Sequence, residues 1–236
     1  LGYQRRHRLK AGVSGYRAEH LHEDQLDLEA ISADTGLSLA YEPVTIEPRF
    51  SLTNVRLAHQ RYLTIARLEN LATWQVDKKA ELFAGLGWED QHYNSVHVAT
   101  SAWEREGRQI DGRIGARYLV EPTLRIGGYG RLYDKNAKKP YNSYHRSEVG
   151  ADATMLLSGG SFLIATVVYQ RDSYRAPDPF VSATTRNDWS LRSRLLYGFP
   201  VANLFEDRVA DWFDGITATV AVERYHQVST IRDYTY

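Results

Sequence analysis

The chain has no cysteine and only one methionine among its 236 residues. The lack of cysteine excludes a disulfide-stapled scaffold and any metal site built from thiolates. No stretch approaches the ~18 consecutive apolar residues that a transmembrane helix needs. If this chain crosses a membrane, it must therefore do so as a closed β-barrel, in which apolar and polar residues alternate along each strand.

An excess of charge is also missing, because 29 Lys and Arg residues balance 29 Asp and Glu residues. Nucleic-acid binders usually carry a basic excess, so we expect no nucleic-acid partner. No P-loop, G-x-S-x-G elbow or H-E-x-x-H motif occurs, and we expect neither enzymatic activity nor a cofactor. His20 and His22 form an H-x-H pair without a third ligand nearby, so no metal site is expected.

The sequence does contain segments in which apolar and polar residues alternate with a period of two. Residues 110–118 carry Ile, Gly, Ile, Ala and Tyr at even positions and Asp, Arg, Gly and Arg at odd ones. Similar alternation runs through 79–88, 148–155, 189–197 and 216–223. Charges at i and i+2 would fall on nearly opposite sides of a helix, whereas they share one face of a strand. The pattern therefore predicts β-strands with one apolar and one charged face.

Tight turns alternate with longer polar stretches along the chain. Short connections are expected at Glu42-Pro43, Asp77-Lys78, Glu121-Pro122 and Gly159-Gly160. The polar stretches between them, at 20–24, 89–108, 134–143 and 171–187, resemble the extracellular loops of outer-membrane barrels, which have short turns on the periplasmic side. We therefore predict an all-β fold, an antiparallel up-and-down transmembrane β-barrel of about 12–14 strands in the bacterial outer membrane, with lipid around it. About 11 or 12 strands are visible in this sequence, so a strand or two is expected outside it.

The two faces of such a barrel predict two sets of residues. The charged face would line the lumen, where we expect Arg67, Glu69, Glu81, Arg113, Arg117, Arg125, Arg131, Glu148, Asp152, Arg192, Arg194 and Glu223. Possible partners across neighbouring strands are Arg113 or Arg117 with Glu81, and Arg125 or Arg131 with Glu148 or Asp152. Aromatic residues near strand ends would form the two interfacial girdles, namely Tyr41, Trp74, Trp88, Tyr118, Tyr133, Tyr169 and Tyr225.

Several segments resemble the barrel of surface lipoprotein assembly modifiers. The likeness lies in the segments 12–17, 36–41, 46–50, 61–77, 81–91, 185–188 and 191–194. The resemblance implies a barrel preceded by a periplasmic tetratricopeptide-repeat domain, and a role in bringing lipoproteins to the cell surface. Residues 1–236 would then be a single barrel domain taken from a longer chain. The family has no catalytic residue to carry over.

Three functions follow from these patterns. The leading hypothesis is an outer-membrane barrel that translocates or displays a protein, such as a surface lipoprotein. The first alternative is a porin or polysaccharide-export channel, because a lumen with charges of both signs and tyrosines suits sugar passage. The second alternative is a soluble ligand-binding β-barrel or sandwich, whose charged face would simply be solvated.

Overall fold

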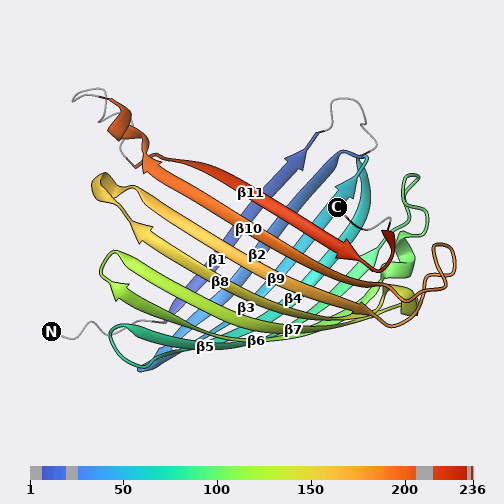
Figure 1. Ribbon diagram of the computed structural model, residues 1–236, viewed down its shortest axis with the longest axis horizontal. Coiled ribbons are helices and arrows are strands. Elements are labelled where there is room, and N and C mark those ends of the chain that lie inside the picture. Colours follow the sequence, from blue (N-terminus) through green and yellow to red (C-terminus); the bar gives the residue numbers. More distant parts are fainter. Residues whose placement is uncertain (1–6, 20–25, 206–214, 233–234, 236) are drawn as a thin grey trace.

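The structure, a computed structural model, describes residues 7–19, 26–205, 215–232 and 235. In this part of the chain, eleven antiparallel strands follow one another in a single sheet, and each strand pairs with the next (Figure 1). No helix in the described residues is long and apolar enough to cross a membrane. His20 and His22 lie outside the described residues.

The strands are long, between 11 and 16 residues. They are β1 (Arg8–Ala18), β2 (Leu28–Tyr41), β3 (Val44–Leu57), β4 (Gln60–Gln75), β5 (Ala80–Tyr93), β6 (Gly107–Glu121), β7 (Leu124–Ala137), β8 (Tyr144–Leu156), β9 (Phe162–Tyr174), β10 (Asn187–Pro200) and β11 (Thr217–Ser229). Short 3-10 helices lie in the connections: η2 (Ala102–Arg105), η3 (Pro140–Asn142), η4 (Ser158–Gly160) and η5 (Val201–Leu204).

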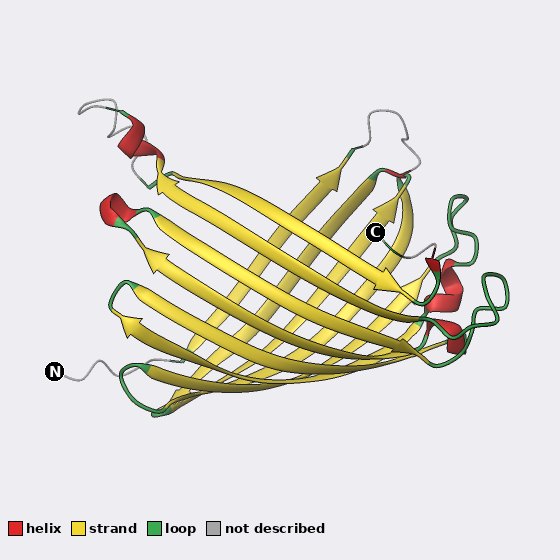
Figure 2. Ribbon diagram, in the orientation of Figure 1, coloured by secondary structure: helices red, strands yellow, loops and turns green. Residues whose placement is uncertain are grey.

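The two ends of the sheet differ in their connections (Figure 2). At one end, called the turn end, β2–β3, β4–β5, β6–β7 and β8–β9 are joined by the short turns that the sequence predicts. At the other, called the loop end, residues 94–106 join β5 to β6 and residues 175–186 join β9 to β10. Two connections differ from this pattern. Ala58 and His59 make a tight turn with positive φ at the loop end, and the connection between β10 and β11, at the turn end, is long.

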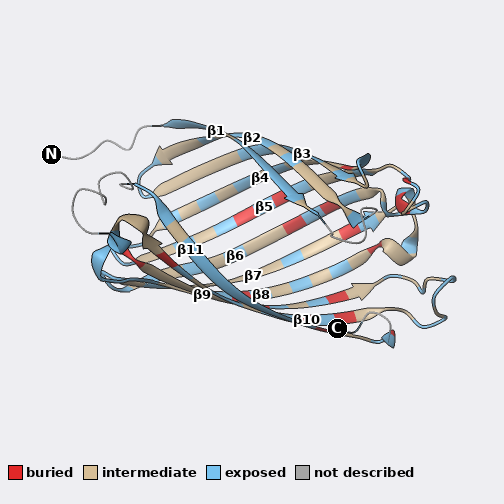
Figure 3. Ribbon diagram, turned by 90° about the horizontal axis from the view of Figure 1, so that it is seen from above, coloured by how far each residue is buried: buried red, intermediate tan, exposed pale blue. Residues whose placement is uncertain are grey.

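The sheet curls, so that β1–β3 and β9–β11 face each other (Figures 1 and 3). We call the inner side of this curve the hollow. β1 and β11 are its two edges, and no pairing joins them among the described residues. Because the number of antiparallel strands is odd, both edges run from the turn end to the loop end. The predicted all-β, up-and-down barrel architecture is thus confirmed, with an opening between β1 and β11 in the described part of the chain.

The usual apolar core of a soluble domain is missing from the described residues. The only apolar residues buried there are Leu63, Val96, Ala102, Val168 and Ile231, whereas exposed large apolar side chains occur on nearly every strand. Figure 3 shows exposed and half-buried positions alternating along the strands. The sheet therefore presents one face to the hollow and the other outward, and its apolar residues do not pack between two layers.

Candidate functional site

The charged residues predicted for the lumen share one face of the sheet. The strand register places Arg67 opposite Glu89, Glu69 opposite Gly87, and Gly87 opposite Asp111. It continues through Arg113 opposite Arg131, Arg131 opposite Glu148, and Arg192 opposite Tyr225. Because residues two apart on a strand point the same way, all twelve predicted lumen residues fall on this face, which lines the hollow. We call it the concave face.

Asp111 lies at the centre of an ion-pair cluster on the concave face. It is only 3 % exposed. Its Oδ1 lies 2.9 Å from Nη2 of Arg67, and its Oδ2 accepts hydrogen bonds from Nη2 and Nε of Arg131 at 2.9 and 3.1 Å. Arg67 also binds Glu89 at 3.1 Å. The carboxylate of Asp111, on β6, thereby links an arginine of β4 to an arginine of β7.

Two glycines make this cluster possible. Arg67 and Asp111 meet above Gly87, where a Cβ atom would lie 2.6 Å from both side chains. Two residues along the same strand, Arg113 crosses above Gly85 to reach Glu69 at 2.5 Å. Side chains from β4 and β6 can meet only because β5 has no side chain between them.

The predicted partners are only partly those observed. Arg117 pairs with Glu81 at 2.6 Å, as the sequence suggests. Arg113 instead binds Glu69 and Arg131 instead binds Asp111. Glu148 accepts a hydrogen bond from the hydroxyl of Tyr129 at 2.9 Å. The pairing proposed for Arg131 with Glu148 or Asp152 is therefore wrong, because Asp111 on the other neighbouring strand occupies the guanidinium.

A second row of ion pairs lies nearer the loop end of the concave face. Arg146 donates to both carboxylate oxygens of Asp172, at 2.7 and 2.9 Å. Its guanidinium also stands 5.0 Å from the ring of Tyr144. Arg186 binds Asp188 at 2.6 Å. Asp172 and Asp188 are buried, so each carboxylate depends on its arginine partner to compensate its charge where the strands enter the loops.

Other charges of the concave face have no ion-pair partner within the described residues. They include six of the predicted lumen residues, namely Arg125, Glu148, Asp152, Arg192, Arg194 and Glu223, together with Lys135 of β7. Arg194 faces Glu223 across β10 and β11, but the two side chains do not come within 4.0 Å. The cluster on β4–β7 is thus largely neutralised internally, whereas β10 presents two free arginines to the hollow.

The opposite, convex face is apolar and ends in aromatic residues. Tyr41, Trp74 and Tyr118 lie on it at the turn end, and Trp88 and Tyr169 lie on it towards the loop end. Trp189, which was not among the predicted girdle residues, also lies on this face, and its ring centroid is 6.3 Å from that of Tyr169 and 5.4 Å from that of His226.

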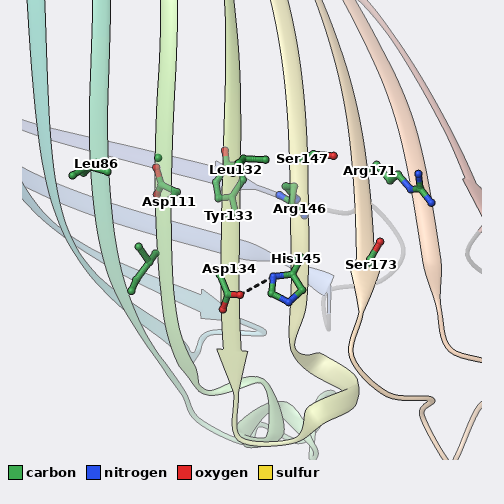
Figure 4. Close-up of a pocket in the computed structure, with 12 residues that line it drawn as sticks. Leu86, Asp111, Leu132, Tyr133, Asp134, His145, Arg146, Ser147, Arg171 and Ser173 are labelled. Carbon is green, nitrogen blue, oxygen red and sulfur yellow. Dashed lines mark ion pairs between the residues drawn. The ribbon is translucent and has the colours of Figure 1, made fainter.

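The apolar part of the convex face has a height close to that of a membrane. Trp189 and Tyr197 are eight residues apart on β10, which is ~26 Å along a strand. A strand tilt near 40° reduces this to about 20 Å across the membrane, near the ~25 Å apolar band of transmembrane barrels. Beyond the aromatic residues the face becomes polar: Asp134 binds His145 at 2.7 Å (Figure 4). Asp134 also binds Arg175 at 2.7 Å.

Two girdle predictions are wrong. Tyr133 is two residues from Arg131 on β7, so it lies on the concave face, where the Arg131 guanidinium stacks 4.3 Å from its ring. Tyr225 is two residues from Glu223 on β11, and its hydroxyl donates to Gln227 on the same face. Both lie near strand ends, as girdle residues do, but the alternation of side chains points them inward.

Sequence reasoning also placed several functional residues in loops. Glu89 and Asp134 were expected in the polar stretches after the strands, but β5 runs to Tyr93 and β7 to Ala137. The sequence did indicate that β5 continues as far as Glu89, because Glu81, Gly85, Gly87 and Glu89 all occupy odd positions and so share one face of the strand. Among the described residues, no group of three His, Asp or Glu side chains is placed to hold a metal ion.

Comparison with known proteins gives only distant structural likenesses. No family model matches the chain, and no curated protein matches it. A crystal structure of OccAB3 from Acinetobacter baumannii aligns at a TM-score of 0.48 and 10% identity, covering 94% of this chain and 63% of that one. The outer membrane protein opdK from Pseudomonas aeruginosa aligns at 0.47 and 12%, covering 92% and 64%.

A bacterial polysaccharide outer membrane secretin aligns at a TM-score of 0.35 and 9% identity, covering 94% of this chain and 90% of that one. The chain thus spans less than two thirds of the OccAB3 and opdK chains. Both opdK and the secretin are outer-membrane proteins. The resemblance to surface lipoprotein assembly modifiers stays a prediction.

Proposed function

We propose that the chain forms the wall of a channel in the bacterial outer membrane, through which polar solutes pass along the concave face. The observation that carries this proposal is the separation of the two faces. Ion pairs and free charges lie towards the hollow, and an apolar band bounded by aromatic residues lies outward. In water, the opposite arrangement would be favourable, because apolar side chains would turn inward.

The exposure of the convex face argues against a soluble sandwich. Leu86, Ile114 and Leu132 are 71%, 69% and 68% exposed, on three neighbouring strands. Contiguous apolar surfaces of this kind are typical of membrane or protein contacts. A lipid bilayer would cover this face without any change in the sheet, so we propose outer-membrane lipid as its partner.

The charge distribution suggests what the channel would favour. The cluster around Asp111 is internally paired and offers little net charge. Among the described residues, the unpaired charges of the concave face on β7–β11 leave a small positive excess, because four cations (Arg125, Lys135, Arg192 and Arg194) stand against three acids (Glu148, Asp152 and Glu223). A hydrated lumen wall with unpaired arginines attracts anions and repels cations. The role proposed is passage of small polar or acidic solutes, without catalysis and without a cofactor.

Conductance across a planar bilayer tests this proposal. The refolded protein, in its full natural chain, should produce stepwise current increases, and the reversal potential in a salt gradient should show a preference for anions. A sample that is folded and inserted, as judged by heat-modifiable gel migration, but gives no current would refute the channel.

A second candidate is translocation of a protein to the cell surface. Two observations favour it: the segments that resemble surface lipoprotein assembly modifiers, and the two edge strands β1 and β11, which have no partner on their outer sides among the described residues. Exposed strand edges can bind an extended segment by β-augmentation. Surface display of a co-expressed lipoprotein should then depend on the barrel, whereas unchanged display after its deletion would count against this role.

A further inference from the structure

A pocket of about 280 Å³ lies at the loop end of the concave face. We call it the mouth pocket. Its floor is formed by Lys135, Tyr144 and Tyr174 at the ends of β7, β8 and β9, and its sides include Arg105 of η2 and Asn142 of η3. These side chains come from different hairpins, so the pocket exists only when the loops assemble over the sheet. Its position is at the entrance of the proposed channel.

Lys135 is the unusual group of the mouth pocket. It is only 6% exposed, and its Nζ donates to the amide oxygen of Gln91 at 2.6 Å. No carboxylate of the described residues lies within 4.0 Å of it. The nearby Glu89 is already bound to Arg67 and Gln91. The ammonium has a neutral amide as its hydrogen-bond partner, and the ring centroids of Tyr93 and Tyr144 lie 5.5 and 6.0 Å from it. A buried ammonium without a carboxylate partner is costly, and an anion in the pocket would relieve that cost.

The other cations of the mouth pocket strengthen this charge. Arg105 has only the hydroxyl of Tyr62 as a recorded partner, at 3.4 Å, and it makes no ion pair within the described residues. Arg186 also lines the pocket and is bound to Asp188. The Arg186–Asp188 pair is neutral, so two uncompensated cations, Lys135 and Arg105, remain. Against them the lining offers a single acid, Asp178, one of whose oxygens accepts the backbone N–H of Phe180. The pocket therefore has a net positive charge.

The remaining lining suits a ring that carries hydroxyl groups. The rings of Tyr144 and Tyr174 stand side by side, with centroids 5.5 Å apart and planes tilted by 52°. Tyrosine offers an apolar ring face and a polar hydroxyl tip. The amide of Asn142 and the carboxylate of Asp178 add groups that can donate to and accept from hydroxyls. The volume is at the lower end of small-molecule pockets, which limits the ligand to about one ring.

We propose that the mouth pocket binds one unit of an acidic sugar, a hexuronate, with its carboxylate on Lys135 and Arg105 and its ring against Tyr144 and Tyr174. The proposal rests on the proposed function only in that the ligand enters from the solvent at the loop end. It names a substrate class for the channel: acidic sugars would be captured here before they meet the free arginines of β10.

Isothermal titration calorimetry with glucuronate tests the pocket, using the refolded full chain in detergent. Glucose is the matched neutral ligand. We expect glucuronate to bind at least ~10-fold more tightly than glucose, because a hydrogen bond to a charged group contributes ~1.5–3 kcal/mol. Lys135→Met should lower the affinity for glucuronate at least tenfold, by the same reasoning.

Matched variants make the result specific. Lys138→Gln removes an exposed cation that stacks on Trp103, outside the pocket, and should change the affinity less than about twofold. If Lys135→Met does not fold, Arg105→Gln serves as the pocket variant, because Arg105 lies in a loop. Arg105→Gln should also lower the affinity for glucuronate. Equal binding of glucose, unchanged affinity in both pocket variants, or no binding of glucuronate would each overturn the inference. Conductance on the same sample separates the two proposals, because an open pore without glucuronate binding refutes only the mouth pocket.

Discussion

Replacing Asp111 by asparagine removes the carboxylate that Arg67 and Arg131 share. The carboxylate is nearly inaccessible and receives three short contacts from the two guanidinium groups, between 2.9 and 3.1 Å. Removing one partner of a buried ion pair typically costs ~3–5 kcal/mol. Here Arg67 keeps Glu89, and Arg131 keeps the ring of Tyr133. We therefore expect the free energy of unfolding to fall by about 2–3 kcal/mol, below the usual range.

Urea unfolding of the refolded barrel, followed by tryptophan fluorescence, measures this loss. The control is Asp134→Asn, which removes an equally charged group from the exposed pair with His145 and Arg175. Exposed pairs contribute ~1 kcal/mol or less. If Asp111→Asn destabilises the protein no more than this control, the cluster does not stiffen the wall, and the reasoning is refuted.

Three further predictions concern other parts of the sheet. Gly87→Ala places a methyl group 2.6 Å from Arg67 and Asp111, so it should destabilise the fold by about 1–3 kcal/mol in the same assay, while Gly130→Ala, with no atom within 4 Å, should have almost no effect. Arg194→Gln should shift the reversal potential of the channel towards cations, whereas Arg224→Gln, on the convex side of β11, should leave it unchanged; equal shifts would contradict the assignment of faces. Asp77, in the β4–β5 turn, has a pKa lowered below the ordinary 3.8 by hydrogen bonds from the backbone N–H groups of Lys79 and Ala80. The contribution of Asp77 to stability should therefore be complete above pH 3.8 and be lost as the pH falls through the lowered pKa. The difference in unfolding free energy between wild type and Asp77→Ala should then shrink below pH 3.8. A difference that does not change with pH would contradict the stabilising role of the Asp77 carboxylate in this turn.

The alternation of side chains was enough to predict the faces. Residues 110–118 show why: a strict period of two assigns every position once one apolar residue is placed outward. The same rule would have corrected Tyr133 and Tyr225, which were assigned from their position near strand ends although Arg131 and Glu223 already fixed their parity. Position along a strand predicts depth in the membrane, but only parity predicts direction.

The partners within the cluster could not be predicted from the sequence. Arg131 has acidic residues within reach on both neighbouring strands, and it binds Asp111 although the register places Glu148 directly opposite it. The meeting of Arg67 with Asp111 further depends on Gly87, whose role is visible only when β4, β5 and β6 are aligned. The mouth pocket was equally hidden, because it brings together five segments whose loops carry no periodic signal.

Single-cysteine labelling tests the central claim most directly, and the absence of native cysteine makes the experiment clean. Leu195 and Arg194 are neighbours on β10, and we expect Leu195 to contact lipid and Arg194 to face the lumen. In lipid vesicles, Arg194→Cys should react with a membrane-impermeant maleimide, whereas Leu195→Cys should resist it. A bimane label at Leu195→Cys should be quenched by brominated lipid. Equal reactivity at both positions, or quenching at neither, would contradict a channel whose charged concave face is its lumen.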